Sequence, residues 1–564
     1  MPLKYLLKQA VKHSPKMQRI YRLYRSHTAS KYLPEWKKLI GAYSGWQNIK
    51  TDNSYTRVLL ATSTGGHPTV PIMDSILSVA LTLRNTNSSY LLCDGCLPAC
   101  QMTECGLIKS KELLNYGPSK YFCKNCYNYS YNIFKETGTK IHKYSEYLDI
   151  NEINKANDIT ESISADSMDT FILDGINIGE HAKAGALRYF AVSSLEGIPN
   201  SGFIFKLYLK SAIITYYAIR NLIKRNRINV ICLNHGIYIP HGIIAEVGRK
   251  LGCRIITWNI AYRSKSFIFS HDDTYHHTLL SEPTSSWENM DWSKEKDDEI
   301  MQYLRSRQGG GRDWIVFQDK KAVTDISAII KKLPKLKKNM PCVILLTNVA
   351  WDAQLHYPAN AFKNMMEWIY YTIDHFIKKQ DIQLLIRIHP AELSGDIPSR
   401  QPVLNEIKKK YNNLPNNIII IAPGKKISTY ALMDICDCAL IYGTKTGVEL
   451  TSRGIPVIVA GEAWIRNKNL TIDVKSPDEY SKALSQIPFN NKLDEPTKVR
   501  AKKYAYHFFF RRMIPINSIE ATGGEPKFKI NINDLSKLGP GNCKGLDVIC
   551  DGIINNEPFV YDND

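Results

Sequence analysis

Short apolar runs that end in glycine, proline or polar turns recur along the chain, separated by longer stretches of mixed polarity. Clear examples cover residues 57–62 (RVLLAT), 229–233, 253–259 and 384–388. Such runs are typical of buried strands, and the stretches between them are long enough for helices. The order strand, helix, strand repeats, so the pattern predicts an α/β fold with parallel strands.

The same pattern predicts how the chain is divided. A chain of 564 residues is too long for a single core, and a charged stretch containing Gly309, Gly310 and Gly311 separates two groups of strands. We therefore expect two α/β domains, joined by a linker and flanked by two extensions. The expected segments are an N-terminal extension (1–50), a first domain (51–300), a linker (301–340), a second domain (341–495) and a C-terminal crossing helix with a tail (496–564).

The run LLIRIHPAEL, residues 384–393, predicts a strand that delivers Arg387, His389 and Pro390 to the carboxyl edge of a sheet. Open α/β sheets bind their ligands at that edge. A cation and an imidazole placed there suit an anion, such as the phosphate of a nucleotide. The alternative is that Arg387 pairs with a carboxylate and that His389 is an ordinary strand-end histidine.

A second stretch of this kind lies at residues 438–452. A short strand is followed by a glycine- and threonine-rich turn, and a helix containing Glu449 begins after it. Backbone N–H groups and hydroxyls in such a turn, together with the helix dipole, favour an anion. Two strand ends suited to phosphate predict a nucleotide site made of Arg387, His389, Pro390, Gly443, Thr444, Thr446 and Gly447.

These residues carry a resemblance to a known family. The segments RIHP (387–390), STYALMDICD (428–437), YGTKTGVEL (442–450) and GIPVI (454–458) resemble the carboxyl-terminal half of the capsule polysaccharide synthesis family. That family includes bacterial Kdo transferases and has counterparts in sialyl- and polysialyltransferases. The resemblance covers residues 340–480, and Thr444 stands where many relatives have serine, which keeps the hydroxyl.

The resemblance implies a GT-B glycosyltransferase, in which two Rossmann-like domains face each other across a cleft and the second holds the sugar nucleotide. It implies that His389 and the turn with Thr444 and Thr446 bind donor phosphate, and it places Glu449 near the donor ribose. Trp351, in the first loop of the second domain, would stack on the base or the sugar. A solvent-facing Glu449 and an interdomain plug at Trp351 are the alternatives.

The first domain is expected to bind the acceptor. Gly65, Gly66 and His67 follow its first strand and resemble the glycine-rich loop of GT-B enzymes that faces the cleft; a tight turn without a ligand is the alternative. Inverting sugar transfer also needs a carboxylate or an imidazole that takes the proton of the acceptor hydroxyl. The candidates are Asp174, His235 and Glu246. Glu246 belongs to a predicted helix, where a surface role is the alternative, and retaining chemistry would leave no simple base.

The thirteen cysteines are clustered, and no secretory segment is predicted, which favours a reducing compartment and metal binding over disulfides. Six of them fall in a small Cys-rich insertion, residues 93–126. The spacing of Cys123 and Cys126 lets two thiolates hold one tetrahedral zinc ion, while the partner pair is ambiguous because Cys93 and Cys96 share that spacing. We predict a structural zinc at Cys100, Cys105, Cys123 and Cys126; free buried thiols and an iron–sulfur cluster are the alternatives.

No cofactor is expected for catalysis. A group of acidic residues and histidines has the composition of a metal cluster, but we expect a polar loop, because GT-B enzymes as a class need no metal in the cleft. This group comprises His271, Asp272, Asp273, His276 and His277.

The net charge of +19 is unevenly distributed, since residues 1–50 contribute eleven Lys and Arg and a single acid, Glu35. Apolar and aromatic residues recur at helical spacing among these cations, which predicts basic amphipathic helices suited to an anionic membrane surface. Alternatives are a helix packed on the enzyme and an RNA contact, although nothing in the sequence matches a nucleic-acid-binding module. Without a membrane-spanning stretch, a cytoplasmic protein on the inner face of the membrane is expected.

These patterns together predict a glycosyltransferase that moves a sugar from a nucleotide sugar to a growing surface polysaccharide or glycolipid. The resemblance to Kdo and sialic acid transferases suggests a CMP-linked donor, and no residue excludes UDP or GDP. The alternatives are a GT-B-type nucleotide-sugar epimerase and a non-catalytic, zinc-bearing scaffold in capsule assembly. The sequence does not separate hexosyl from Kdo or sialyl transfer.

Overall fold

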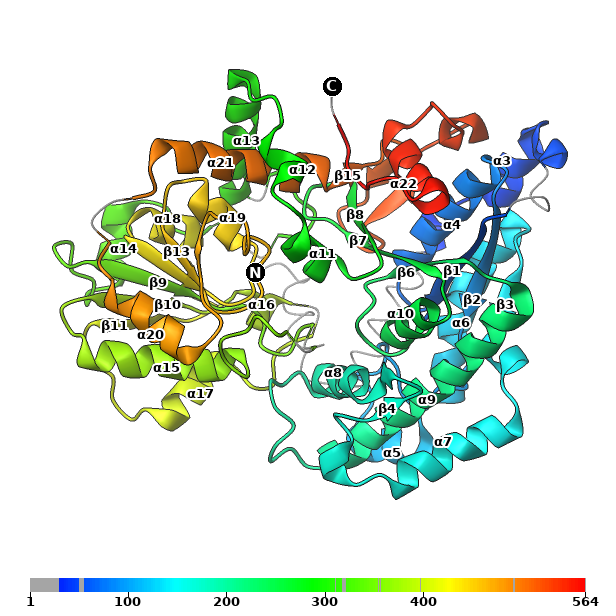
Figure 1. Ribbon diagram of the computed structural model, residues 1–564, viewed down its shortest axis with the longest axis horizontal. Helices are drawn as coiled ribbons and strands as arrows, with labels where there is room; N and C mark the ends of the chain where they lie inside the picture. Colours follow the sequence, from blue (N-terminus) through cyan, green and yellow to red (C-terminus); the bar gives the residue numbers. More distant parts are fainter. Residues whose placement is uncertain are drawn as a thin grey trace.

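The computed structural model describes residues 30–49, 55–309, 311–316, 321–353, 355, 357–395, 397–489 and 492–562. In this part of the chain, two domains lie side by side, each built on a mainly parallel sheet (Figure 1). The prediction of an α/β fold with two Rossmann-like domains that face each other is therefore confirmed.

The sheet of the first domain has the order β15-β8-β7-β6-β1-β2-β3. Counted within this domain, the order is the 3-2-1-4-5-6 arrangement of Rossmann folds, with a strand from the C-terminal segment added at one edge. All strands are parallel except β8, which is antiparallel to both of its neighbours. The strands are β1 (Arg57–Ser63), β2 (Asn87–Leu92), β3 (Ile141–Lys143), β6 (Val230–Asn234), β7 (Arg254–Ile260), β8 (Ser266–His271) and β15 (Ile514–Pro515).

The strands of this sheet are buried on both faces. Along β1, Leu59 and Ala61 belong to one hydrophobic core while Val58 and Leu60 belong to another, because successive side chains of a strand point to opposite faces. Helices supply the rest of both cores. They are α8 (Ile178–Phe190), α9 (Ser201–Asn226) and α10 (His241–Lys250) on one face, and α4 (Val70–Thr82), α6 (Lys120–Phe134) and α22 (Lys544–Asn555) on the other.

The second domain has a wholly parallel sheet of order β11-β10-β9-β12-β13-β14, which is again 3-2-1-4-5-6 in chain order. Its core lies on both faces, with α15 (Met365–Lys378) and α20 (Pro477–Ser485) on one and α18 (Thr429–Asp434) and α19 (Thr446–Thr451) on the other. The strands are β9 (Cys342–Leu346), β10 (Gln383–Arg387), β11 (Ile418–Ile421), β12 (Cys438–Ile441), β13 (Val457–Val459) and β14 (Ile472–Asp473).

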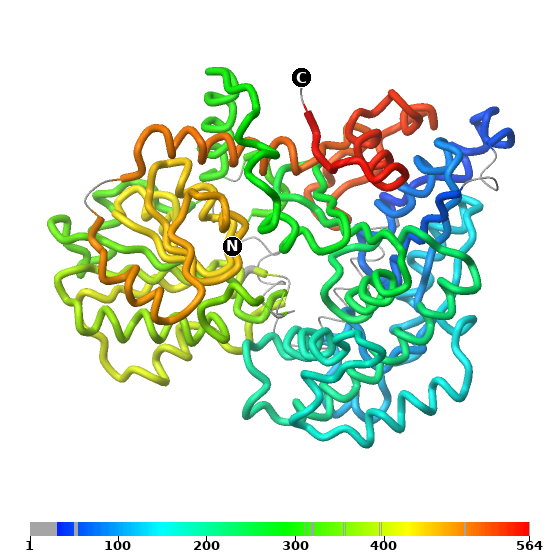
Figure 2. The backbone as a smooth tube through the Cα atoms, viewed as in Figure 1, coloured from blue at the N-terminus to red at the C-terminus, as the bar shows by residue number. Residues whose placement is uncertain are grey.

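The chain passes between the domains twice. The first passage follows α13 (Lys294–Ser306), and the second follows α21 (Glu495–Tyr506), which packs against α13 and continues into a π-helical turn (His507–Arg511). The C-terminal segment then adds β15 to the first sheet, and α22 packs against α4. Figure 2 follows this return, which brings the red C-terminal segment beside the blue segment that contains α4.

The strongly basic beginning of the chain, residues 1–29, lies outside the described residues. Of the predicted N-terminal extension, the structure describes η1 (Ser30–Tyr32), α3 (Trp36–Ala42) and η2 (Trp46–Asn48). Trp36 is buried in the core that α4 also contributes to, so this part packs on the first domain. Over the described residues, we find no helix with both the length and the apolar character needed to cross a membrane.

Candidate active site

Each sheet has one switch point, where the strand order reverses: between β1 and β6 in the first domain, and between β9 and β12 in the second. Ligands of open α/β sheets bind outside the carboxyl ends of the strands at such points. His235 follows β6 directly, and the loop beginning at Thr347 follows β9. In the second domain, a Cβ atom added at Gly443 would lie 3.8 Å from Asn348 Nδ2, so the loops after β9 and β12 adjoin.

His389 follows β10 and is held by its own backbone. Its N–H donates to Thr347 Oγ1 at 2.9 Å, and its Nδ1 accepts from the N–H of Ala391 at 3.1 Å. Because Nδ1 is an acceptor, the ring proton lies on Nε2. Burial, assisted by the positive charges of Lys445 and Arg387, lowers the pKa of His389 to about 4. At neutral pH this residue is therefore a neutral N–H donor at the carboxyl edge of the sheet.

The guanidinium of Arg387 is engaged with the protein. It donates to Ala422 O at 2.9 Å, to Thr429 Oγ1 at 3.2 Å and to Ile427 O at 3.4 Å. These contacts fix the loop after β11, so Arg387 shapes the edge of the site from a buried position. Pro390 precedes the short helix α16 (Ala391–Ser394) and directs the chain away from the strand end.

Thr444 and Thr446 point their hydroxyls at each other, with 2.9 Å between the two Oγ1 atoms, and the N–H of Thr446 donates to Thr444 Oγ1 at 3.4 Å. Helix α19 begins here and has only six residues, so its dipole is small and the hydroxyls are the main donors. Gly447 is required by packing, because a Cβ atom there would lie 2.7 Å from both Ile441 and Ile465.

Glu449 is buried in an ion network rather than in an open pocket. Its Oε1 lies 2.7 Å from Lys445 Nζ and 3.4 Å from Nε of Arg307, a linker residue that also pairs with Asp313. Burial alone would raise the pKa of the Glu449 carboxyl, but Lys445 and Arg307 outweigh it and hold the pKa at about 2. Lys445 also lies over the ring of Tyr262 in the first domain, 4.8 Å from its centre. The network therefore joins the linker and both domains.

Trp351, which we expected to stack on the donor, is buried in the loop after β9. Its Nε1 donates to Ser399 Oγ at 3.1 Å, and 8% of the residue is exposed. The structure gives it a packing contact within the second domain.

His235 occupies the facing edge of the first domain. Its φ of 68° is in the left-handed region, which histidine tolerates better than most residues, and it turns the chain sharply at the end of β6. The centre of its ring lies 5.4 Å from that of Tyr238 and 5.9 Å from that of His276. Burial lowers the pKa of His235, and the charge of Asp352 in the other domain opposes this effect. A neutral imidazole at this place can accept a proton.

Tyr238 connects the two domains. Its hydroxyl donates to Asp352 Oδ1 at 2.6 Å and accepts from the N–H of Ala353 at 2.7 Å. The guanidinium of Arg188 lies over the ring of Tyr238 at 5.2 Å. The charge of Asp352 raises the pKa of His389 as well as that of His235, against the effect of burial, so one carboxylate influences a histidine of each domain.

This contact gives a prediction. We expect Tyr238→Phe to remove both hydrogen bonds and to raise the rate of hydrogen exchange at the Ala353 amide. An unpaired buried donor costs about 1–3 kcal/mol, which corresponds to a roughly 5- to 150-fold larger equilibrium constant for local opening of the loop. Hydrogen-exchange mass spectrometry of the loop after β9 measures this. Tyr216→Phe is the matched control, since Tyr216 donates within the first domain to Asp174. Equal exchange in both variants would contradict the interdomain role.

A second interdomain contact forms at α11 (Tyr275–Ser281). His277 pairs through Nδ1 with Asp273 at 3.0 Å, and its Nε2 lies 3.6 Å from Glu462 Oε2 in the second domain. The rings of Tyr275 and His276 each lie 5.6 Å from that of Trp464. The prediction of a polar loop is wrong for His271, which ends β8, and for His276 and His277, which lie on α11. In the sequence, the adjacent pair of histidines was a signal of this contact.

Several buried polar atoms in the facing loops and in α11 have no hydrogen-bond partner within the described part of the chain. They include His235 Nδ1, His276 Nε2 and Asn348 Oδ1. Burying such an atom without a partner costs about 1–3 kcal/mol, so a bound polar molecule that supplies the partners would be stabilised. The atoms come from both domains, which places the candidate active site between them.

The other two candidates for the base lie elsewhere. Asp174 is in the turn between β4 (Ile172–Leu173) and β5 (Ile176–Asn177), accepts from Tyr216 and lines a separate cavity of about 350 Å³ with Lys250. Glu246 on α10 pairs with Arg249 and lies 3.8 Å from His181 Nε2. Burial would raise the pKa of Glu246, but His181 and Arg249 hold it at about 2. The structure brings neither carboxylate into contact with His235.

The loop after β1 has a packing role. A Cβ atom at Gly65 would lie 2.6 Å from Cys126 O, and one at Gly66 would lie 3.1 Å from Cys126 Sγ, so only glycine allows α6 to approach. His67 accepts from the N–H groups of Thr69 and Val70 through Nδ1, at 3.2 and 3.3 Å, and so caps α4.

The four cysteines predicted to bind zinc are not brought together. Burial and the nearby thiols Cys100, Cys93 and Cys123 raise the pKa of Cys126, so these thiols lie near one another. Cys105 instead accepts from Arg400 Nη1 at 2.7 Å, at a contact between the domains. Among the residues that the structure describes, no group of three His, Cys, Asp or Glu side chains is arranged to hold a metal ion. The zinc stays a prediction that metal analysis of the purified protein can test.

No protein-family model and no curated protein matches the chain. Among solved structures, it is similar to a Thermosulfurimonas dismutans KpsC β-Kdo 2,4 transferase, with 11% identity, 49% of this chain and 80% of that one covered, and a TM-score of 0.34. It is also similar to the UDP-GlcNAc 2-epimerase of Neisseria meningitidis, with 9% identity, 80% of this chain and 98% of that one covered, and a TM-score of 0.24. The UDP-GlcNAc 2-epimerase of Methanocaldococcus jannaschii is similar with 13% identity, the same two coverages and a TM-score of 0.26.

Proposed function

We propose that this protein is a glycosyltransferase that takes a sugar from a nucleotide sugar held by the second domain and delivers it to a glycan acceptor held by the first. The observation that carries the proposal is the set of unpartnered buried atoms of His235, His276 and Asn348 between the domains. These atoms lie near the switch points of the two sheets, which face each other. Because each switch point can bind one ligand, the arrangement suits a reaction between two substrates.

On this proposal, the second domain binds the donor phosphate. The Nε2–H of neutral His389 and the hydroxyls of Thr444 and Thr446 are fixed donors at the carboxyl edge. Donors aimed where the leaving-group charge develops stabilise the transition state more than the ground state. A CMP-linked donor is the finer form of the proposal and rests on the resemblance to Kdo and sialic acid transferases.

On the acceptor side, His235 is the proposed base. Its low pKa keeps the imidazole neutral at pH 7, so that it can take the proton of an acceptor hydroxyl. Asp352 lies within electrostatic reach and would stabilise the imidazolium that forms. We propose a growing surface polysaccharide or glycolipid as the acceptor, and contact with the inner face of the membrane, because the basic residues of the N-terminal extension suit an anionic surface.

Calorimetric titration with CMP, UDP and GDP tests the donor site. We expect preference for one nucleotide, and roughly 10- to 100-fold weaker binding in His389→Ala, because a hydrogen bond to a charged group is worth about 1.5–3 kcal/mol. His375→Ala, which removes a histidine of α15 in the same domain, is the control and should bind as the wild type does.

The outcomes of this experiment separate the alternatives. No binding of any of the three nucleotides would remove the proposal and favour a non-catalytic scaffold. Binding of UDP, followed by turnover of a UDP-sugar without any acceptor, would favour a nucleotide-sugar epimerase. Turnover that requires an added glycan would support the transferase.

A further inference from the structure

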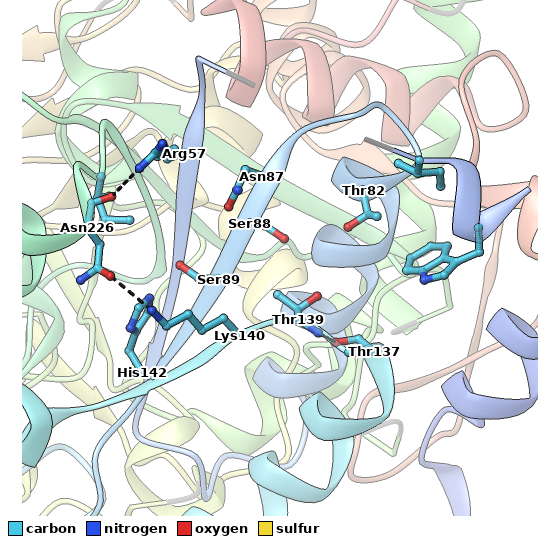
Figure 3. Close-up of a pocket in the computed structure, with 14 residues that line it drawn as sticks. Arg57, Thr82, Asn87, Ser88, Ser89, Thr137, Thr139, Lys140, His142 and Asn226 are labelled. Atoms are coloured by element: carbon cyan, nitrogen blue, oxygen red, sulfur yellow. Dashed lines mark hydrogen bonds between the residues drawn. The ribbon is translucent and has the colours of Figure 1, made fainter. Parts of the chain in front are cut away.

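A polar cavity of about 460 Å³ opens at the amino ends of β1, β2 and β3, on the edge of the first sheet opposite to the candidate active site (Figure 3). Arg57 begins β1, Asn87 to Ser89 begin β2, and Lys140 immediately precedes β3. The cavity shares no residue with the candidate active site, so its ligand is separate from the proposed donor and reaction centre.

Two polar side chains face this cavity without forming a side-chain hydrogen bond to another described residue. They are the amide of Asn87 and the hydroxyl of Ser89, both of which line the cavity. Ser89 is only 6% exposed. Neither polar group is among the buried atoms that lack a partner, so both are open to the cavity, where a ligand can bind them in place of water.

Two cations in the cavity are not neutralised. Arg57 Nη1 donates to Asn226 O at 3.3 Å, and Lys140 Nζ lies 3.5 Å from Asn226 Oδ1 (Figure 3). Both acceptors are uncharged, and neither cation forms an ion pair within the described residues. His142 adds no charge at neutral pH, because burial and Lys140 lower its pKa to about 4. The described residues that line the cavity include no carboxylate, so this lining carries net positive charge.

The remaining lining is hydroxyl-rich, with one indole. Thr82, Ser88 and Thr139 supply hydroxyl groups, and partly exposed Trp46 of η2 forms part of the wall. Hydroxyl and amide groups match the hydroxyls of a sugar, an aromatic ring packs against its C–H face, and cations match an acidic substituent. We propose that this cavity binds an acidic saccharide unit, recognised by Arg57 and Lys140 together with Asn87, Ser89 and Trp46. The inference does not depend on the proposed reaction.

Ligand-observed NMR and calorimetry of the full chain with trigalacturonate, as an acidic oligosaccharide, test this site. Maltotriose tests neutral sugars, and inorganic phosphate tests simple anions. We expect trigalacturonate to bind, with at least tenfold weaker binding in Lys140→Gln and in Trp46→Ala, and unchanged binding in Lys111→Gln, an exposed lysine of α5 (Ser110–Tyr116). Nucleotide binding should persist in all three variants, which shows that they are folded.

Several results would overturn the proposal. Failure of trigalacturonate to bind, or equal affinity in the wild type and Lys140→Gln, would exclude the cavity as its site. Equal binding of maltotriose would remove the role of the cations, and displacement by phosphate at equal concentration would assign a simple anion site. Loss of trigalacturonate binding in His389→Ala would place the ligand in the candidate active site instead. Because that variant tests nucleotide binding separately, the two proposals fail independently.

Discussion

His235→Gln should lower turnover of the nucleotide sugar by about 10²–10⁴-fold, the usual contribution of a positioned general base, while nucleotide binding stays unchanged. The reason is position: of the three candidates for the base, His235 alone follows a strand at the switch point and acts electrostatically with Asp352 of the other domain. Release of nucleotide from the donor identified by calorimetry, with an acceptor glycan present, measures the effect.

The same assay compares the alternatives. His375→Gln is the matched control and should keep full turnover. Asp174→Asn and Glu246→Gln should change turnover little, because Asp174 lines a different cavity and Glu246 is paired with Arg249. A large loss in either of these variants, with full turnover in His235→Gln, would contradict the assignment of the base.

Glu449→Ala is expected to destabilise the protein by about 3–5 kcal/mol, because it leaves the buried charges of Arg307 and Lys445 without their carboxylate. Side-chain exposure is 1% for Glu449 and 4% for Arg307, so little solvent screens these charges. Denaturant unfolding followed by tryptophan fluorescence measures the change. Glu406→Ala is the control: its partner Lys409 is 72% exposed, and such a surface pair is worth about 0–1 kcal/mol.

The stability that Glu449, Lys445 and Arg307 contribute should also depend on pH, and it should fall in acid. The pKa of Glu449 is about 2 in the folded protein, below its ordinary value of 4.5. The folded state therefore binds fewer protons than the unfolded state between these values. The stabilisation is complete above pH 4.5 and is lost as the pH falls towards 2. Glu449→Ala should lack this component, and an unchanged acid unfolding profile would show that the ion network is not a source of stability.

The positions of the strands could be predicted from local sequence. The run RVLLAT became β1, and LLIRI became β10, because both faces of a parallel strand are buried and the whole run must be apolar. The same reasoning placed His235 and His389 just beyond strand ends. The C-terminal tail was less predictable: residues after 520 are largely polar, yet α22 forms there because its apolar stripe packs on α4.

The partners of charged side chains could not be predicted. Arg387 and His389 lie two residues apart, but the guanidinium donates to the loop after β11 while the imidazole accepts from the N–H of Ala391 through Nδ1. Glu449 was expected beside a ribose and instead meets Arg307 of the linker. Such partners come from segments far apart in the chain, and no local pattern encodes them.

The sequence by itself determined the two α/β domains and the strand ends that carry His235, His389 and the threonine turn, because periodicity and turn chemistry act over a few residues. Only the tertiary structure decided which of these residues meet. It joined Tyr238 to Asp352 across the domains and placed Asp174 in a separate cavity. It also placed Asn87 and Ser89 in the lining of the cavity at the opposite edge of the first sheet. The physical reason is that hydrogen bonds and ion pairs depend on the relative placement of whole sheets, which is fixed by packing between segments that are distant in the chain.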